Sequence, residues 1–236
     1  SLKILRHFKP EDECVLEPGD MLYLPPQAAH DGIALGECMT ISIGFRVPDT
    51  ASLARGMLEA AADQATARAG GVSGPYGDPP LPGPTLTGLY KDPGQPATAH
   101  PAQIPDRLTA AAVQSVAKIR FDEALATRFL GCWLSEPNQL AVFDHLEVPA
   151  GDDEEHALPT HWVLDRRTRM LYRGTQLFIN GEVACVRAET GLRQLADDRE
   201  LAADSQAARK LSPDATDALA DWVDAGWIHA IRRQTP

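Results

Sequence analysis

Few residues in this 236-residue chain combine a reactive type with a spacing that chemistry requires. His30 follows Gly19 and Pro25 in the pattern Gly-x5-Pro-x4-His, and the imidazole ring is a common metal ligand. The stretch His145-Leu146-Glu147 has the His-x-Glu spacing that metal ligands also use. The four cysteines are scattered and form no Cys-x-x-Cys, so they indicate neither a zinc site nor a redox motif. The two histidine patterns are therefore the candidates to weigh.

The residues around His30 have the pattern of two short strands joined by a turn. Residues 21–24 are apolar and are followed by two prolines, which cannot donate a hydrogen bond to a sheet. Residues 38–45 alternate between large apolar side chains, such as Ile41, and small ones, including Thr40 and Ser42. A face of small, partly polar side chains suits the inside of a narrow barrel that holds a small ligand.

This pattern resembles a known family. The spacing of Gly19, Pro25 and His30 resembles the second cupin motif, although Gln27 and Ala34 replace its usual glycine and asparagine. The segments PGDMLYLPP, HDG and SIGFR are more specifically similar to the cupin-like JmjC ribosomal oxygenases of bacteria. That family consists of iron(II)- and 2-oxoglutarate-dependent protein hydroxylases. The later parts of the chain agree with it, so the resemblance covers almost the whole sequence.

The resemblance implies roles for a few residues. His30 would donate one nitrogen to iron(II), while Thr40 and Ser42 would help to hold 2-oxoglutarate. Thr40 and Ser42 could instead be outward-facing strand residues, and Asp31 is interpreted as a neighbouring or surface residue rather than a ligand. No further catalytic residue is assigned. His145-x-Glu147 is not expected to bind metal, because it lies about 115 residues after His30 in another domain.

The same resemblance limits what this chain can do alone. In the family, the metal is held by a His-x-Asp pair together with a distal histidine, the facial triad of non-haem iron oxygenases. That pair lies upstream of the segment that matches Gly19, whereas the 18 residues before Gly19 contain no His-x-Asp. The chain is therefore interpreted as the C-terminal portion of an oxygenase, and we expect it to be inactive by itself.

Composition narrows the remaining functions. The net charge of −11 argues against nonspecific binding to nucleic acid. It is compatible either with solubility alone or with binding a basic partner such as a ribosomal protein. No run of about 18 apolar residues predicts a membrane span. The scattered thiols indicate a reducing cytoplasm.

The region after the barrel segment is predicted to be helical. A helix is expected from Asp49 or Thr50 to the glycines at 70 and 71. Its alanine-rich stripe fits either a helix–helix interface or a surface helix. Residues 75–105 contain nine prolines, yet their apolar side chains suggest that the segment lies across the helices. Two further helices are expected after Pro105 and after Asp122. The resemblance implies that this region forms a homodimer.

The last hundred residues are predicted to form a small mixed unit. Three strands are expected at 170–172, 176–179 and 183–186, with Asn180-Gly181 as a hairpin turn. A helix should start at Ser212-Pro213 and end near Gly226. This pattern matches the winged-helix domain of the family. Residues 159–236 contain 11 Lys and Arg against 11 Asp and Glu, so a nucleic-acid face is not expected despite an arginine cluster at 166–173.

The sequence thus predicts an α+β protein in three parts. Residues 1–48 would be the remnant of a cupin or jelly-roll barrel, residues 49–135 a helical dimerisation region with the Pro-rich segment, and residues 136–236 a winged-helix-like domain. The favoured function is iron(II)- and 2-oxoglutarate-dependent hydroxylation of a ribosomal protein. A non-catalytic cupin that binds a ligand and a winged-helix regulatory protein remain alternatives. An upstream His-x-Asp would favour the enzyme over the binding protein.

Overall fold

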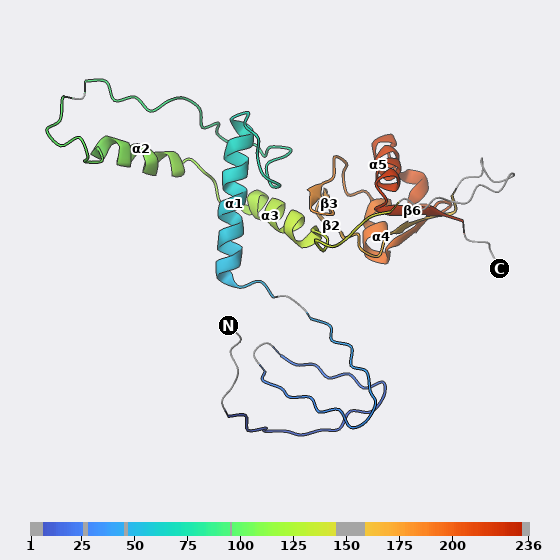
Figure 1. The fold of residues 1–236 in the computed structure, drawn as a ribbon. Helices are drawn as coiled ribbons and strands as arrows, with labels where there is room; N and C mark the ends of the chain where they lie inside the picture. Colours follow the sequence, from blue (N-terminus) through green and yellow to red (C-terminus); the bar gives the residue numbers. More distant parts are fainter. Residues whose placement is uncertain (1–6, 26–27, 45–46, 95, 145–158, 233–236) are drawn as a thin grey trace. The chain divides into compact units, whose positions relative to one another are not determined.

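The structure, a computed structural model, describes residues 7–25, 28–44, 47–94, 96–144 and 159–232 of the chain. The chain divides into two compact units, residues 1–47 and 48–236, each of which is described by itself. The second unit contains α-helices and small antiparallel sheets (Figure 1), which confirms the mixed helix and sheet class. No helix within the described residues is both long and apolar enough to cross a bilayer.

The first unit has no helix or strand among its described residues, so the strands predicted over 21–24 and 38–45 are wrong here. Their alternating apolar side chains are exposed, with Met39 at 89%, Ile41 at 80% and Ile43 at 75%. A strand exists through hydrogen bonds to a neighbouring strand. An alternating pattern gives a strand one apolar face, but it does not provide the neighbouring strand. The described segments of the first unit pair with no other described segment. Residues 1–6, 26–27 and 45–46 of the prediction lie outside the described residues.

Two helices of the second unit, α1 (Thr50–Arg68) and α3 (Glu123–Ser135), pack against each other. Both helices start where they were predicted to start, and each is capped by an aspartate whose side chain accepts a backbone N–H bond: Asp49 and Asp122. Gly56 allows close approach, because a Cβ atom there would lie only 2.1 Å from the ring of Phe129. The alanine-rich stripe of α1, including Ala60, is buried against this pair. It is therefore a helix–helix interface within the chain.

Part of the Pro-rich segment is fixed onto these helices by two buried polar side chains. Gln64 donates to the carbonyl of Tyr76 at 2.5 Å and accepts from the N–H of Leu81 at 2.6 Å. Arg128 of α3 donates to the carbonyl of Pro79 at 2.8 Å. The predicted position across the helices is thus correct for the start of the segment. Further along the segment, apolar side chains that were expected to lie across the helices stay exposed, with Leu89 at 88% and Tyr90 at 44%.

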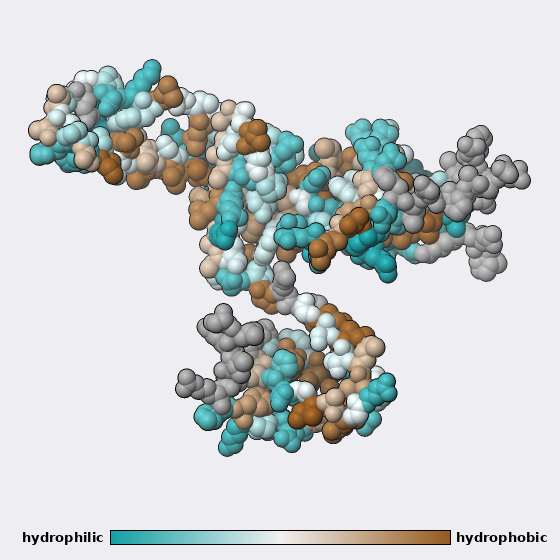
Figure 2. All heavy atoms as spheres, viewed as in Figure 1, coloured by the Kyte–Doolittle hydropathy of each residue, from teal (hydrophilic) through white to brown (hydrophobic). Residues whose placement is uncertain are grey.

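The helix α2 (Asp106–Val116) begins after Pro105, as predicted, but buries none of its residues. Its apolar side chains are exposed, with Leu108 at 41%, Val113 at 66% and Val116 at 60%. Figure 2 shows apolar atoms at the surface along this helix. The helix therefore presents an apolar face without a partner among the described residues.

Three strands form a small antiparallel sheet in the order β2 (Met170–Arg173), β3 (Gln176–Ile179) and β4 (Glu182–Val183). Asn180 and Gly181 connect β3 to β4 with φ of 48° and 90°, which confirms the predicted hairpin turn. The strand predicted over 183–186 is wrong beyond Val183, where the ladder ends.

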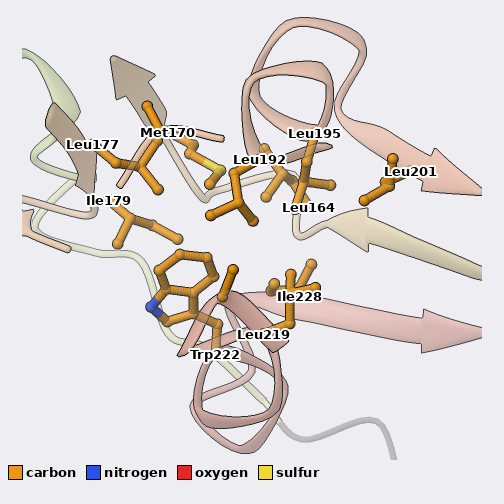
Figure 3. Close-up of a cluster of buried hydrophobic side chains, with 12 residues drawn as sticks. Leu164, Met170, Leu177, Ile179, Leu192, Leu195, Leu201, Leu219, Trp222 and Ile228 are labelled. Carbon is orange, nitrogen blue, oxygen red and sulfur yellow. The ribbon is translucent and has the colours of Figure 1, made fainter. Parts of the chain in front are cut away.

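A second antiparallel sheet has the order β5 (Glu200–Ala202), β1 (His161–Leu164) and β6 (Ile228–Ile231). Two helices enclose the core with it, α4 (Thr190–Asp198) and α5 (Pro213–Asp224), and a short 3-10 turn η1 (Ala208–Lys210) precedes α5. Figure 3 shows Trp222 of α5 pointing towards Leu192 of α4 and Ile179 of β3. One apolar core thus joins both sheets to both helices.

The helix α3 also packs on the first of these sheets. Its Gly131 faces Phe178 of β3 so closely that a Cβ atom would lie 2.4 Å from the ring. Ser135 accepts a hydrogen bond from the N–H of Gly181 at 3.0 Å, and Glu123 forms an ion pair with Arg173. The same helix therefore contacts α1 and the β2–β4 sheet.

Gly131→Ala tests this contact. Alanine favours a helix over glycine by about 0.5–1 kcal/mol, whereas its Cβ atom would clash with the ring of the buried Phe178. We expect the clash to dominate and the free energy of unfolding in urea to fall by about 1–3 kcal/mol.

The control is Ala124→Met, which adds bulk on the exposed side of the same helix and should change stability by less than about 0.5 kcal/mol. A Gly131→Ala protein as stable as the wild type would show that α3 does not pack on β3 as described.

Candidate functional site

Two turns bracket the segment that leads to His30. The N–H of Asp20 donates to the carbonyl of Glu17 at 3.0 Å, and Gly19 within this turn has φ of +99°. Nothing lies within 4 Å of a Cβ atom built at Gly19, so the backbone angle and not space requires glycine. After Pro25, its carbonyl accepts from the N–H of Ala28 at 3.1 Å. The glycine and the proline of the pattern thus both sit in turns.

The imidazole of His30 is exposed and has one backbone partner. Its Nδ1 lies 3.2 Å from the carbonyl oxygen of Ala28. Because a carbonyl oxygen only accepts, this contact requires the proton on Nδ1. The lone pair of the neutral ring is then on Nε2, the arrangement in which a histidine binds a metal through Nε2 while a carbonyl orients it.

The other predicted site residues are not brought into one cluster by the described structure. Thr40 and Ser42 are exposed, as is Asp31. Within the described ranges, no group of three or more His, Cys, Asp or Glu side chains could hold a metal ion. His30 leaves Nε2 free for a single metal bond, and no further ligands gather around it within the described residues. His145 and Glu147 lie outside the described residues.

A second cluster of charged groups surrounds Asp165, at the end of β1, and was not predicted. Arg167 donates to its carboxylate from Nε at 2.8 Å and from Nη2 at 3.1 Å. His229 of β6 donates from Nε2 to Oδ2 at 3.1 Å, and Arg199 donates to the Asp165 carbonyl at 2.7 Å. Thr168 ties the same turn to Trp227 through a hydrogen bond of 2.8 Å. Both carboxylate oxygens already have donors, so the cluster joins the β1–β2 turn to β6.

The arginines predicted as a cluster are largely used inside the fold. Arg167 contacts Asp165, and Arg173 contacts Glu123. Arg166 and Arg169 are exposed and have no side-chain partner within the described part of the chain. Half of this cluster is therefore engaged with acidic side chains of the domain itself, and only Arg166 and Arg169 of the cluster remain for contacts with phosphates.

Comparisons with known proteins define the class to which these features belong. A JmjC domain matches residues 1–53, which include the two turns and His30. A ROXA-like winged helix matches residues 118–229, from just before α3 to β6. The chain therefore resembles JmjC ribosomal oxygenases that carry a ROXA-like winged helix, and the resemblance noted in the sequence is confirmed.

Individual relatives agree with this class. The chain is homologous to the ribosomal protein uL16 3-hydroxylase of Escherichia coli (strain K12), with 31% identity over 216 residues, 90% of this chain and 52% of that protein. A probable ribosomal oxygenase of Haemophilus influenzae is 44% identical over 43 residues, 18% of this chain and 11% of that protein. The chain thus spans about half the length of the Escherichia coli relative.

Solved structures show the same fold. The match to the ribosomal oxygenase YcfD from Escherichia coli covers 79% of this chain and 48% of the YcfD chain, with a TM-score of 0.50 and 21% identity. A structure of YcfD in complex with cobalt and 2-oxoglutarate matches 79% of this chain and 47% of its own length, also with a TM-score of 0.50 and 21% identity.

The Asp165 cluster predicts a specific dependence of stability on pH. The Arg167 guanidinium holds the pKa of Asp165 well below its ordinary value, burial opposes this effect, and His229 adds to the lowering. A carboxyl group with a lowered pKa in the folded state stabilises the protein above its unfolded pKa of about 3.9. This contribution is lost as the pH falls below that value towards the folded pKa.

Asp165→Asn should therefore lower the free energy of unfolding near neutral pH by about 1–3 kcal/mol, because Arg167 and His229 lose their charged acceptor. The variant should also lose less stability than the wild type on acidification from pH ~4 to pH ~2. Urea unfolding at these pH values measures both effects. Asp204→Asn, an exposed acid of the same domain, is the control. Equal acid sensitivity of Asp165→Asn and wild type would contradict the role of this cluster.

Proposed function

We propose that this chain is part of an iron(II)- and 2-oxoglutarate-dependent hydroxylase that acts on a ribosomal protein in the cytoplasm. The JmjC match over residues 1–53, with Gly19 and Pro25 in turns before His30, is the observation that carries the proposal. The homologous Escherichia coli protein is a hydroxylase of ribosomal protein uL16, and this chain spans 52% of it. Which ribosomal protein is modified depends on the whole protein.

His30 is proposed as one metal ligand. The hydrogen bond from Nδ1 to the carbonyl of Ala28 would hold the ring so that Nε2 faces the metal. Iron with 2-oxoglutarate would supply the oxidising chemistry, and the protein would supply binding and orientation. The remaining ligands would come from residues that the described structure does not bring to His30.

Thr40 and Ser42 are proposed to bind 2-oxoglutarate. Both hydroxyl groups are exposed, and the two residues are separated by one position, so they share a side of an extended segment. The apolar side chains between and beside them would pack outward in a jelly-roll barrel. Pairing with strands outside the described segment would bury Met39, Ile41 and Ile43, which supports the proposed barrel.

His30→Ala tests the metal role in the full-length protein that contains this chain. We expect 2-oxoglutarate turnover to fall to background, because an iron(II) site with three protein ligands would lose one of them. Succinate production measured with added iron(II) gives the rate, and iron content after dialysis gives the binding. His100→Ala removes an exposed histidine from the Pro-rich segment and serves as the control. Unchanged turnover in His30→Ala would remove His30 from the site.

A non-catalytic cupin is the second candidate function. It is favoured by the lack, among the described residues, of any gathered set of three metal ligands. In that case the segment around His30 would bind a ligand without turning over 2-oxoglutarate. Absence of a His-x-Asp in the full-length protein would support it. A winged-helix regulator that binds nucleic acid is disfavoured, because Arg167 and Arg173 are engaged with acidic side chains.

The domain organisation remains a proposal in three parts: a barrel segment at 1–48, a helical region at 49–135 and a winged-helix domain at 136–236. A position before α3 is proposed for the second boundary, supported by the winged-helix match from residue 118 and the packing of α3 on β2, β3 and β4. α1, α2 and the Pro-rich segment would then form the middle region.

The middle region is also proposed to form a homodimer. α2 is amphipathic and buries no residue. Its apolar side therefore forms a continuous exposed strip, as expected of a helix whose interface is uncovered. Ala112, Val113, Val116 and Ala117 form a shallow, open apolar surface on this side. A second copy of the chain would cover it with its own α2.

Val113→Asp combined with Val116→Asp should convert the dimer into a monomer at micromolar concentration, because two carboxylates would be buried unpaired in the interface. Light scattering coupled to gel filtration measures the mass. Gln114→Asp, on the polar side of the same helix, is the matched control and should leave the dimer intact. A wild-type monomer would contradict the proposal.

A further inference from the structure

A shallow apolar groove of about 270 Å³ lies in the winged-helix domain between α5 and the pair of strands β1 and β6. Trp162 and Ala230 are register partners on the two strands and form one wall. Leu219, Ala220 and Val223 of α5 form the other wall. The groove is separate from the His30 segment, and no function described above uses it.

The helix beside this groove is strongly acidic. α5 contains four aspartates and no lysine or arginine, and the aspartates recur every three or four residues on one exposed side: Asp214, Asp217, Asp221 and Asp224. Asp224 itself lines the groove. None of the four carboxylates makes an ion pair with a described residue. The side of the groove formed by α5 is therefore acidic.

We propose that this groove binds a basic protein segment with a single apolar anchor. The anchor side chain would enter between Trp162 and Val223, while lysines and arginines on either side would lie along the aspartates of α5. An apolar groove with an acidic rim selects for this combination, since the anchor needs burial and the flanking cations need carboxylates. The inference does not rest on the catalytic proposal, because it involves only α5, β1 and β6.

Other occupants fit the charges less well. Nucleic acid and anionic membranes would be repelled by four unpaired carboxylates. A second copy of the chain carries a net charge of −11, so it would bring more negative charge to this face. A basic segment is the partner for which both the groove and its rim are favourable.

The test uses the whole 236-residue chain and a fluorescein-labelled synthetic peptide in which lysines and arginines flank one phenylalanine. Fluorescence anisotropy measures the affinity, and we expect saturable binding that weakens as salt is added. Replacing the phenylalanine of the peptide by serine should weaken binding about tenfold, because the anchor is lost. Ala220→Trp, which fills the groove, should have a similar effect on the original peptide.

The acidic rim is tested by a matched pair of triple variants. Asp217→Asn, Asp221→Asn and Asp224→Asn together should weaken peptide binding about tenfold. Glu182→Gln, Asp198→Asn and Asp204→Asn remove three exposed negative charges elsewhere in the domain, and this control should bind within about twofold of the wild type. Circular dichroism verifies that both proteins are folded.

Three results of the peptide experiments would overturn the inference. These are no binding of the peptide by the wild type, equal weakening in the two triple variants, and no dependence on the phenylalanine or on Ala220→Trp. Tighter binding of a labelled duplex DNA than of the peptide would also overturn it. Turnover of 2-oxoglutarate by the full-length protein is a separate measurement. A failure of peptide binding can therefore be told apart from a failure of the proposed hydroxylase activity.

Discussion

The second unit depends on one helix that is buried on two sides. α3 packs on α1 where Gly56 makes room for the Phe129 ring, and on β3 where Gly131 makes room for the Phe178 ring. Ser135 then binds the turn between β3 and β4, and burial raises the pKa of the Cys132 thiol to about 11. Such close contacts tolerate little added volume, so the helix pair and the sheet are fixed relative to α3.

Buried polar groups extend this framework to irregular segments. Gln64 and Arg128 hold the start of the Pro-rich segment through backbone carbonyls, and Asp165 holds the β1–β2 turn against β6 through Arg167 and His229. In each case side-chain hydrogen bonds replace the regular pairing that the backbone lacks. Arg128 and Arg167 are therefore used to hold irregular segments of the protein itself.

Local signals predicted the elements that carry their own start and stop residues. Asp49, Asp122 and Ser212 cap the three helices that were predicted around them, and Asn180-Gly181 closes its hairpin. α4 was missed because it lacks such signals: no side chain caps its N-terminus, and it ends at Arg199 with φ of 63° rather than at a glycine. β1 and β5 were missed because their pairing joins residues far apart in sequence.

At the candidate site, too, the features set by neighbouring residues were predicted, and those set by residues far apart in sequence were not. The turns at Gly19 and Pro25 follow from local residue types, and the hydrogen bond to Ala28 gives His30 a defined tautomer. The predicted strands beside them did not form, because alternation in residues 38–44 specifies a face and not the strand that covers it. The ligands that complete a metal site are distant information of the same kind, and Asp165 with His229 was missed for the same reason.

The central claim is that the full-length protein hydroxylates a ribosomal protein, and mass spectrometry of large-subunit ribosomal proteins tests it most directly. After incubation with the protein, iron(II) and 2-oxoglutarate, we expect one ribosomal protein to gain a single oxygen atom at one residue. The gain should require 2-oxoglutarate and should be absent when it is omitted. Unmodified ribosomal proteins, under conditions in which the protein is folded and iron is supplied, would contradict the account.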